Sequence, residues 1–216
     1  MNLVFISPPA AGKGTISDML KQKYDLTNIS VGQLLRDVDS STPVGMKIRE
    51  IQQTGQLVDL SITVSLLEKR LEQPDIKKGF ILDGFPRNLE QALELNELLN
   101  KIGVSLDHAV YLKVDEETAK KRILGRLVCP NCKATFNNLT GFNTPIKEGV
   151  CNICSSSLES RNDDNEESFK KRFNLFNKET YPVVDYYKKL GKLIEVDASL
   201  GKPEETLKEL ERKLGL

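Results

Sequence analysis

The sequence predicts an α/β protein in which a parallel sheet is covered by helices on both faces and carries one small insertion. Short apolar runs typical of buried strands alternate with stretches in which apolar residues recur every three or four positions. Such alternation favours a parallel sheet, because the chain must cross back over the sheet between consecutive strands. Residues 127–163 break the alternation, since they are rich in Asn, Ser, Thr, Gly and Cys and poor in aliphatic residues. The length of 216 residues fits one domain with such an insertion.

The expected elements follow in order from the N-terminus. The apolar run 3–6 predicts a strand, and Ile16, Met19 and Leu20 behind it have the spacing of one buried helix face. Further strands are expected at residues 80–82, 109–112 with Val114, and 193–196. Helices are expected at residues 89–99, at 117–124 and after Pro203, where Leu207, Leu210 and Leu214 form an apolar stripe.

The charge of the chain is balanced, with 31 Lys and Arg against 31 Asp and Glu. This balance argues against binding nucleic acid or a membrane surface through bulk charge, although a local basic cleft is compatible with it. No apolar run approaches the roughly 20 residues that cross a bilayer, and no signal peptide is recognisable at the N-terminus. We therefore expect a cytoplasmic protein whose partners are neither nucleic acids nor membranes.

The four cysteines form two C-x-x-C pairs, Cys129 with Cys132 and Cys151 with Cys154. A disulfide set or an unmetallated redox pair is conceivable, but two such pairs at this separation favour a Zn²⁺ ion held by four thiolates. A closed all-cysteine site leaves no open coordination position, so the zinc is expected to be structural. It would stabilise an insertion that has little apolar surface to bury.

The first expected strand runs directly into residues 7–15, Ser-Pro-Pro-Ala-Ala-Gly-Lys-Gly-Thr, and then into a helix. Strand, glycine-bearing loop, Lys13 and helix start are the parts of a phosphate-binding loop, in which backbone N–H groups and a cation surround phosphate oxygens. The strict loop pattern is only partly met, because Ser7 stands at its first glycine and Gly14 follows Lys13.

A second polar cluster, Asp83 to Arg87, follows the strand at 80–82, and Gln91 lies one helical turn beyond it. Ligands of open parallel sheets bind at the carboxyl ends of the strands, so this cluster should lie beside the phosphate loop. There Asp83 can hold Mg²⁺ through water, and Arg87 can bind a second phosphate. Arg36 follows a small-residue turn and, taken alone, indicates only a surface residue. The single histidine, His108, is expected to have no catalytic role.

Together these motifs resemble those of adenylate kinases, and the resemblance runs over essentially the whole chain. It is to the long-lid, zinc-bearing type found in many bacteria. The motifs that carry it are Gly12-Lys13-Gly14-Thr15, Ser30-x-Gly32-x-Leu34-Leu35-Arg36, Thr54-Gly55-x-Leu57-Val58, Asp83-Gly84-Phe85-Pro86-Arg87-x-x-x-Gln91, Arg122-Ile123-x-Gly125-Arg126, Arg161-x-Asp163-Asp164 and Arg172.

The resemblance implies a P-loop NTPase-like fold that transfers the γ-phosphoryl group of ATP to AMP with Mg²⁺, giving two ADP, in a monomer. It implies a core of residues 1–29, 60–126 and 164–216, an AMP-binding segment of 30–59 and a zinc-bearing lid of 127–163. ATP is assigned to Pro8, Pro9, Ala10, Ala11, Gly12, Lys13, Gly14, Thr15, Arg122, Arg126 and Lys202. AMP is assigned to Val31, Arg36, Gly55, Leu57, Val58, Gly84, Arg87, Gln91, Arg161 and Arg172. Catalytic roles fall on Lys13, Asp83, Arg87, Arg126, Arg161 and Arg172, and structural Zn²⁺ on Cys129, Cys132, Cys151 and Cys154.

The chain departs from the family pattern at several positions. Ser7 and Ala10 replace glycines of the phosphate loop, Leu127 replaces a second arginine, Val31 replaces a threonine, and residues 59–61 replace Pro-Asp-Glu. The zinc loop is about two residues longer than the spacing common in the family. These departures leave two alternatives open: a nucleoside monophosphate kinase with another acceptor base, and a catalytically weak nucleotide-binding homologue.

Overall fold

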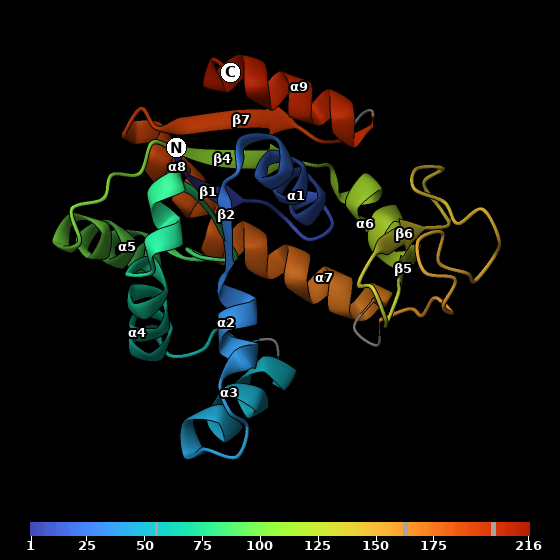
Figure 1. Ribbon diagram of the computed structural model, residues 1–216, viewed down its shortest axis with the longest axis horizontal. Coiled ribbons are helices and arrows are strands. Elements are labelled where there is room, and N and C mark those ends of the chain that lie inside the picture. Colours follow the sequence, from blue (N-terminus) through green and yellow to red (C-terminus); the bar gives the residue numbers. More distant parts are fainter. Residues whose placement is uncertain (55, 162–163, 200–201) are drawn as a thin grey trace.

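Five parallel strands form the central sheet of the computed structural model, which describes residues 1–216 except 55, 162–163 and 200–201 (Figure 1). Their spatial order is β2-β3-β1-β4-β7. Their bounds are β1 Asn2–Ile6, β2 Thr27–Ser30, β3 Phe80–Asp83, β4 His108–Lys113 and β7 Leu193–Asp197. The sequence predicts four of the five strands; β2 escapes prediction because Ile29 is the one buried residue in a short polar run.

Helices cover both faces of the sheet, as predicted. Because side chains alternate along a strand, Val4 packs with one set of helices and its neighbours Leu3 and Phe5 with the other. The first set is α2 Val31–Asp37, α4 Leu60–Leu71, α5 Leu89–Lys101 and α8 Tyr181–Lys189. The second set is α1 Lys13–Tyr24, α6 Glu116–Leu124, α7 Glu166–Leu175 and α9 Pro203–Leu214.

Two parts of the chain project from this core (Figure 1). One is α3, which spans Pro43–Thr54 and follows α2. The other is the predicted insertion, in which β5 (Arg126–Val128) pairs with the antiparallel β6 (Thr135–Asn137). The remaining elements are a 3-10 turn, Pro74–Lys78, and a π-helical turn, Phe176–Thr180.

The insertion is attached closely to the end of α6. The side-chain Nδ2 of Asn137 donates to the carbonyl of Arg122 at 2.7 Å, and the backbone N–H of Asn138 donates to the carbonyl of Gly125 at 3.0 Å. A Cβ at Gly125 would collide with the side chains of Asn137 and Leu139, so only glycine permits this approach. The base of the insertion is thereby joined to the helix that carries Arg122.

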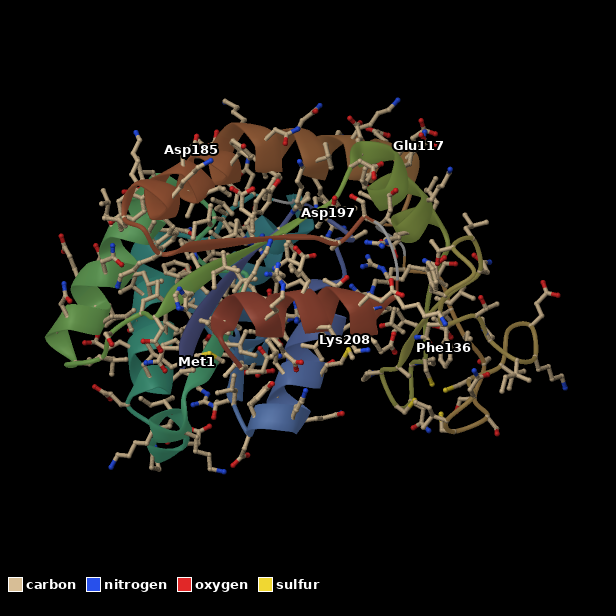
Figure 2. All side chains as sticks on the ribbon, turned by 90° about the horizontal axis from the view of Figure 1, so that it is seen from above. Met1, Glu117, Phe136, Asp185, Asp197 and Lys208 are labelled. Carbon is tan, nitrogen blue, oxygen red and sulfur yellow. The ribbon has the colours of Figure 1, made fainter. Side chains whose placement is uncertain are left out.

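The parallel register brings several strand ends together at one edge of the sheet. Asp83, the last residue of β3, lies opposite Phe5 of β1 and Ser30 of β2. Figure 2 shows that the carboxyl end of β7, marked by Asp197, faces the insertion that carries Phe136, whereas Met1 lies on the opposite side. Among the described helices, none has both the length and the apolar composition that a membrane span requires.

Candidate active site

A cleft of about 1780 Å³ opens at the carboxyl ends of the strands. It brings together nearly all the residues that the sequence assigns to ATP, to AMP or to catalysis. Those lining it are Pro8, Pro9, Ala10, Ala11, Gly12, Lys13, Gly14, Thr15, Val31, Arg36, Leu57, Val58, Asp83, Gly84, Arg87, Gln91, Arg122, Arg126, Arg161 and Arg172. Lys202 is not in the lining, although the next residue, Pro203, is. Gly55 lies outside the described residues.

The phosphate loop leads from β1 into α1, and its backbone turns sharply twice. Ala10 has a φ of 60° and Gly12 a φ of 85°, both in the left-handed region, whereas Ser7 does not have a positive φ. Gly12 caps α1 without a side chain, and the first turn of the helix contains no acidic residue. The N–H groups at the start of α1 are therefore available to an anion, which the helix dipole also favours.

Lys13 and Asp83 form an ion pair at the floor of the cleft. The Nζ of Lys13 lies 2.5 Å from the Oδ1 of Asp83, and both side chains keep part of their surface exposed. The first residue of α1 and the last residue of β3 thus meet beside the phosphate loop. A bound phosphate would contact the ammonium group of Lys13, and a hydrated metal ion would contact the carboxylate of Asp83.

Arg87 lies in the cleft lining among other positive charges. Its Nε donates to the carbonyl of Gly84 at 2.9 Å, which fixes the direction of the side chain. Desolvation lowers the pKa of Arg87, and the nearby charges of Arg172 and Arg36 lower it further, whereas Asp83 acts in the opposite direction; the residue nevertheless remains exposed to solvent in the open cleft. A cluster of like charges of this kind favours binding of an anion.

The amide of Gln91 has a defined orientation. The side chain is 5% exposed, and its Oε1 accepts a hydrogen bond from the backbone N–H of Arg87 at 2.7 Å. Within the described contacts the Nε2 donates to no protein group, so it remains as a donor at the cleft wall. Buried apolar side chains from Val31 and Val58 lie in the same lining.

Arg126 is held by a carboxylate that the sequence analysis gave no role. Its Nε donates to Asp164 Oδ2 at 2.7 Å and a terminal nitrogen donates to the other oxygen, which makes a two-point contact. The Asp164 side chain is 1% exposed, and its backbone N–H donates to the carbonyl of Arg161 at 3.0 Å. Asp164 therefore fixes the plane of the Arg126 guanidinium through its carboxylate and the backbone at Arg161 through its N–H group. The acidic pair after Arg161 marks a carboxylate at this point of the sequence but does not show that it pairs with Arg126.

Arg122 is partly buried in the cleft lining. Burial lowers its pKa, while the carboxylates of Asp115 and Asp197 act in the opposite direction. Several lining residues were also missed by the sequence analysis, because no motif marks them. They come mainly from the insertion and α7: Lys133, Thr135, Phe136, Asn137, Phe142, Ile153, Ser168 and Lys171.

The four cysteine sulfurs lie within 4.8 Å of one another. The Sγ atoms of Cys129 and Cys154 are 3.4 Å apart, and those of Cys132 and Cys151 are 3.5 Å apart. Zn–S bonds of about 2.3 Å place the sulfurs of a tetrahedral site about 3.8 Å apart, so the cluster fits zinc closely. These four cysteines are not joined by disulfides.

In each cysteine pair a backbone N–H points at the sulfur of the first cysteine, which supports a metal site. The backbone N–H of Cys132 points at the sulfur of Cys129 (3.5 Å), and that of Ile153 at the sulfur of Cys151 (3.4 Å). Hydrogen bonding between Cys154 and Ser156 lowers the pKa of Cys154 to about 5. Donors aimed at sulfur favour thiolates, which are the form that binds metal.

A five-stranded parallel sheet, a phosphate loop after its first strand and arginines converging on the same cleft define a nucleotide-binding phosphotransferase. Comparison with known proteins narrows the class. The sequence profile of the family described as adenylate kinase matches residues 5–192. The adenylate kinase of Fervidobacterium nodosum is 44% identical to this chain, over 91% of this chain and 90% of its own length. The adenylate kinase of Thermosipho africanus is 42% identical, over 93% of each chain. The adenylate kinase of Caldicellulosiruptor bescii is 37% identical over the whole of both chains. The chain belongs to the adenylate kinase family and is an enzyme.

Position 10 generates a prediction about the phosphate loop. A left-handed conformation costs an L-residue roughly 1–2 kcal/mol, is free for glycine and is worst for β-branched residues. We predict that kcat/KM for ATP is modestly raised by Ala10→Gly and falls about tenfold in Ala10→Val. Steady-state kinetics at saturating acceptor measures both. Ser7→Val is the matched control, because a β-branched residue is tolerated at negative φ. Equal activity of Ala10→Val and the native enzyme would show that the loop does not need its left-handed turn.

Proposed function

We propose that the cleft transfers the γ-phosphoryl group of ATP to AMP, giving two ADP, in a readily reversible reaction. The observation that carries this proposal is that a phosphate loop and arginines from several elements line one cleft in a chain of the adenylate kinase family. Transfer between two nucleotides requires positioning and positive charge more than a covalent nucleophile. The cleft supplies both.

The donor nucleotide occupies the side of the cleft formed by the phosphate loop. Residues 8–15 surround its phosphates with backbone N–H groups, and Lys13 leaves Asp83 to share its charge with a phosphate oxygen. Arg122 packs on the adenine, which suits a guanidinium that is half-buried and already low in hydration. Lys202 contributes from the start of α9 at the rim.

The acceptor nucleotide occupies the side of the cleft formed by α2 and the loop after β3. Arg36 and Arg87 bind its phosphate, and Gln91 reads its base. Val31, Leu57 and Val58 form the apolar wall beside that base. Gly55 is also assigned to this side from the motif it belongs to.

Arg126, Arg161 and Arg172 act on the phosphoryl group in transfer. Its charge is spread over three oxygens, and fixed guanidinium groups stabilise it without moving during the reaction. Asp164 keeps Arg126 in a defined orientation. Mg²⁺, when bound with ATP, neutralises phosphate charge, and the partly exposed Asp83 carboxylate fits a role in holding its water shell.

The proposed division of the chain follows these roles. Residues 1–29, 60–126 and 164–216 form the core, residues 30–59 bind AMP, and residues 127–163 form a lid. Closure of the lid brings Arg126 and Arg161 onto the phosphates and excludes water, which otherwise competes as acceptor. The four cysteines hold a structural Zn²⁺ in the lid. We further infer a cytoplasmic monomer that binds neither nucleic acid nor membranes, in keeping with its balanced charge.

The orientation of Gln91 generates a prediction about the acceptor base. Its free Nε2 is a donor, so it can donate a hydrogen bond to N1 of adenine. Guanine and uracil present an N–H at the same edge, and two donors facing each other form no hydrogen bond. We predict that AMP is preferred over GMP and UMP by at least about 100-fold in kcat/KM. Gln91→Leu should lose most of this preference.

Coupled assays with AMP, GMP, CMP and UMP test this assignment. Equal or better turnover with CMP or UMP would favour the monophosphate kinase with another acceptor base, for which Val31 in place of threonine is the specific indication. Absence of turnover with every acceptor, together with tight ATP binding, would favour the catalytically weak homologue.

The cysteine cluster generates a prediction about stability. Cys129→Ser and Cys154→Ser each remove a zinc ligand from a segment whose own core is small, so both should lose bound zinc and lower the melting temperature. Turnover at low temperature should remain largely intact. Calorimetry and metal analysis measure these effects, with Asn131→Ser between the cysteines as control. Complete loss of activity at an unchanged melting temperature would contradict a structural role.

A further inference from the structure

A π-helical turn, Phe176–Thr180, joins α7 to α8 beside the acceptor side of the cleft. The backbone N–H of Tyr181 donates to the carbonyl of Phe176, five residues back. Pro182 follows and has no N–H to donate to the carbonyl of Lys178, and its ring would collide with that carbonyl in a regular helix. The sequence therefore opens the helix at this point. Turns of this kind frequently occur at functional sites.

The π-helical turn is anchored to the central sheet by aromatic packing. Tyr111 of β4 is 7% exposed and stacks on Phe176, with ring centroids 6.2 Å apart. The ring of Tyr181 meets Tyr111 edge-on at 6.1 Å. Because the first residue of the turn and the residue that follows the turn both pack on Tyr111, the residues between them hold a fixed position relative to the sheet.

Thr180, the last residue of this turn, reaches the loop after β3. Its Oγ1 donates to the backbone carbonyl of Arg87 at 2.7 Å. The backbone N–H of the same arginine donates to Gln91 Oε1, also at 2.7 Å. Both backbone polar groups of Arg87 are therefore fixed by side chains, one from α5 and one from the π-helical turn.

The hydrogen bond from Thr180 to Arg87 joins two parts of the chain that carry like charges. Desolvation lowers the pKa of Arg87, and the nearby charge of Arg172 lowers it further; like charges separate unless the scaffold holds them. Arg172 lies on α7, and the π-helical turn is the continuation of α7. The Thr180–Arg87 hydrogen bond thus links the element that carries one guanidinium to the loop that carries the other.

We propose that Thr180 is a positioning residue for the acceptor nucleotide, because its hydroxyl, presented by the π-helical turn, holds the backbone of Arg87 where its guanidinium meets the AMP phosphate. The proposal rests on the proposed role of Arg87 in binding that phosphate. Its consequence is asymmetric: loss of the hydroxyl weakens AMP binding and leaves ATP binding unchanged.

The test compares three variants of the full enzyme. Thr180→Val removes the donor at nearly constant shape, and Thr180→Ser keeps it. Thr27→Val is the matched control, because it removes a threonine-to-carbonyl bond of the same kind, to Asp75 at 3.0 Å, away from the cleft. We expect Thr180→Val to raise the KM for AMP and its calorimetric Kd about fivefold, with the KM for ATP within about twofold. Thr180→Ser should restore native values, and Thr27→Val should change neither constant.

A second variant keeps the proposal testable if Thr180→Val does not fold. Pro182→Ala restores the missing N–H at an exposed position, which permits a regular helix and withdraws Thr180 from Arg87. The same selective rise in the KM for AMP is expected. Equal increases for both nucleotides, or a change in melting temperature alone, would overturn the proposal.

Arg87→Gln separates this inference from the proposed function. If Arg87→Gln strongly raises the KM for AMP while Thr180→Val does not, the positioning role of Thr180 is wrong and the acceptor site stands. If Arg87→Gln leaves AMP binding unchanged, the assignment of the acceptor phosphate to Arg87 is wrong. The proposed positioning role of Thr180 is then wrong as well.

Discussion

The main physical constraint on this structure is that several permanently positive side chains must stand together in one cleft before a substrate neutralises them. Like charges at close range repel, and a guanidinium stays charged at every physiological pH. Two carboxylates offset part of this repulsion, since Asp83 pairs with Lys13 and the buried Asp164 pairs with Arg126. The remaining repulsion is resisted by the scaffold. Strand ends, a helix start and side-chain hydrogen bonds fix the backbone from which each positive side chain extends.

The two carboxylates differ in what they are attached to. Asp83 ends a central strand, so the register with β1 and β2 fixes it. Arg126 and Asp164 lie where the insertion leaves the core and where it returns, so their ion pair closes the base of the insertion. In the proposed mechanism, a phosphate that attracts Arg126 therefore acts on the hinge of the lid. In the same proposal, Zn²⁺ bound by the four cysteines keeps the far part of the insertion folded while that base moves.

Much of the fold and of the cleft could be predicted from local patterns, because buried parallel strands are apolar and their carboxyl ends meet at one edge. The polar run of β2, at residues 27–30, gave no such pattern. The pairing of Asp164 with Arg126 depends on residues 38 positions apart, and nothing local shows which cation a carboxylate will meet. The contact of Thr180 with Arg87 spans 93 positions and depends on a π-helical turn, so it too required the structure.

The measurement that tests a single cleft shared by two nucleotides most directly is calorimetric titration with a compound that joins two adenosines through five phosphates. Such a compound offers both bases and the charge of the transferring group at once, so it should bind far more tightly than either substrate. We predict one molecule bound per chain, competition by ATP and by AMP, and weaker binding as salt rises. Two molecules bound per chain, or competition by ATP alone, would contradict a cleft that holds donor and acceptor together.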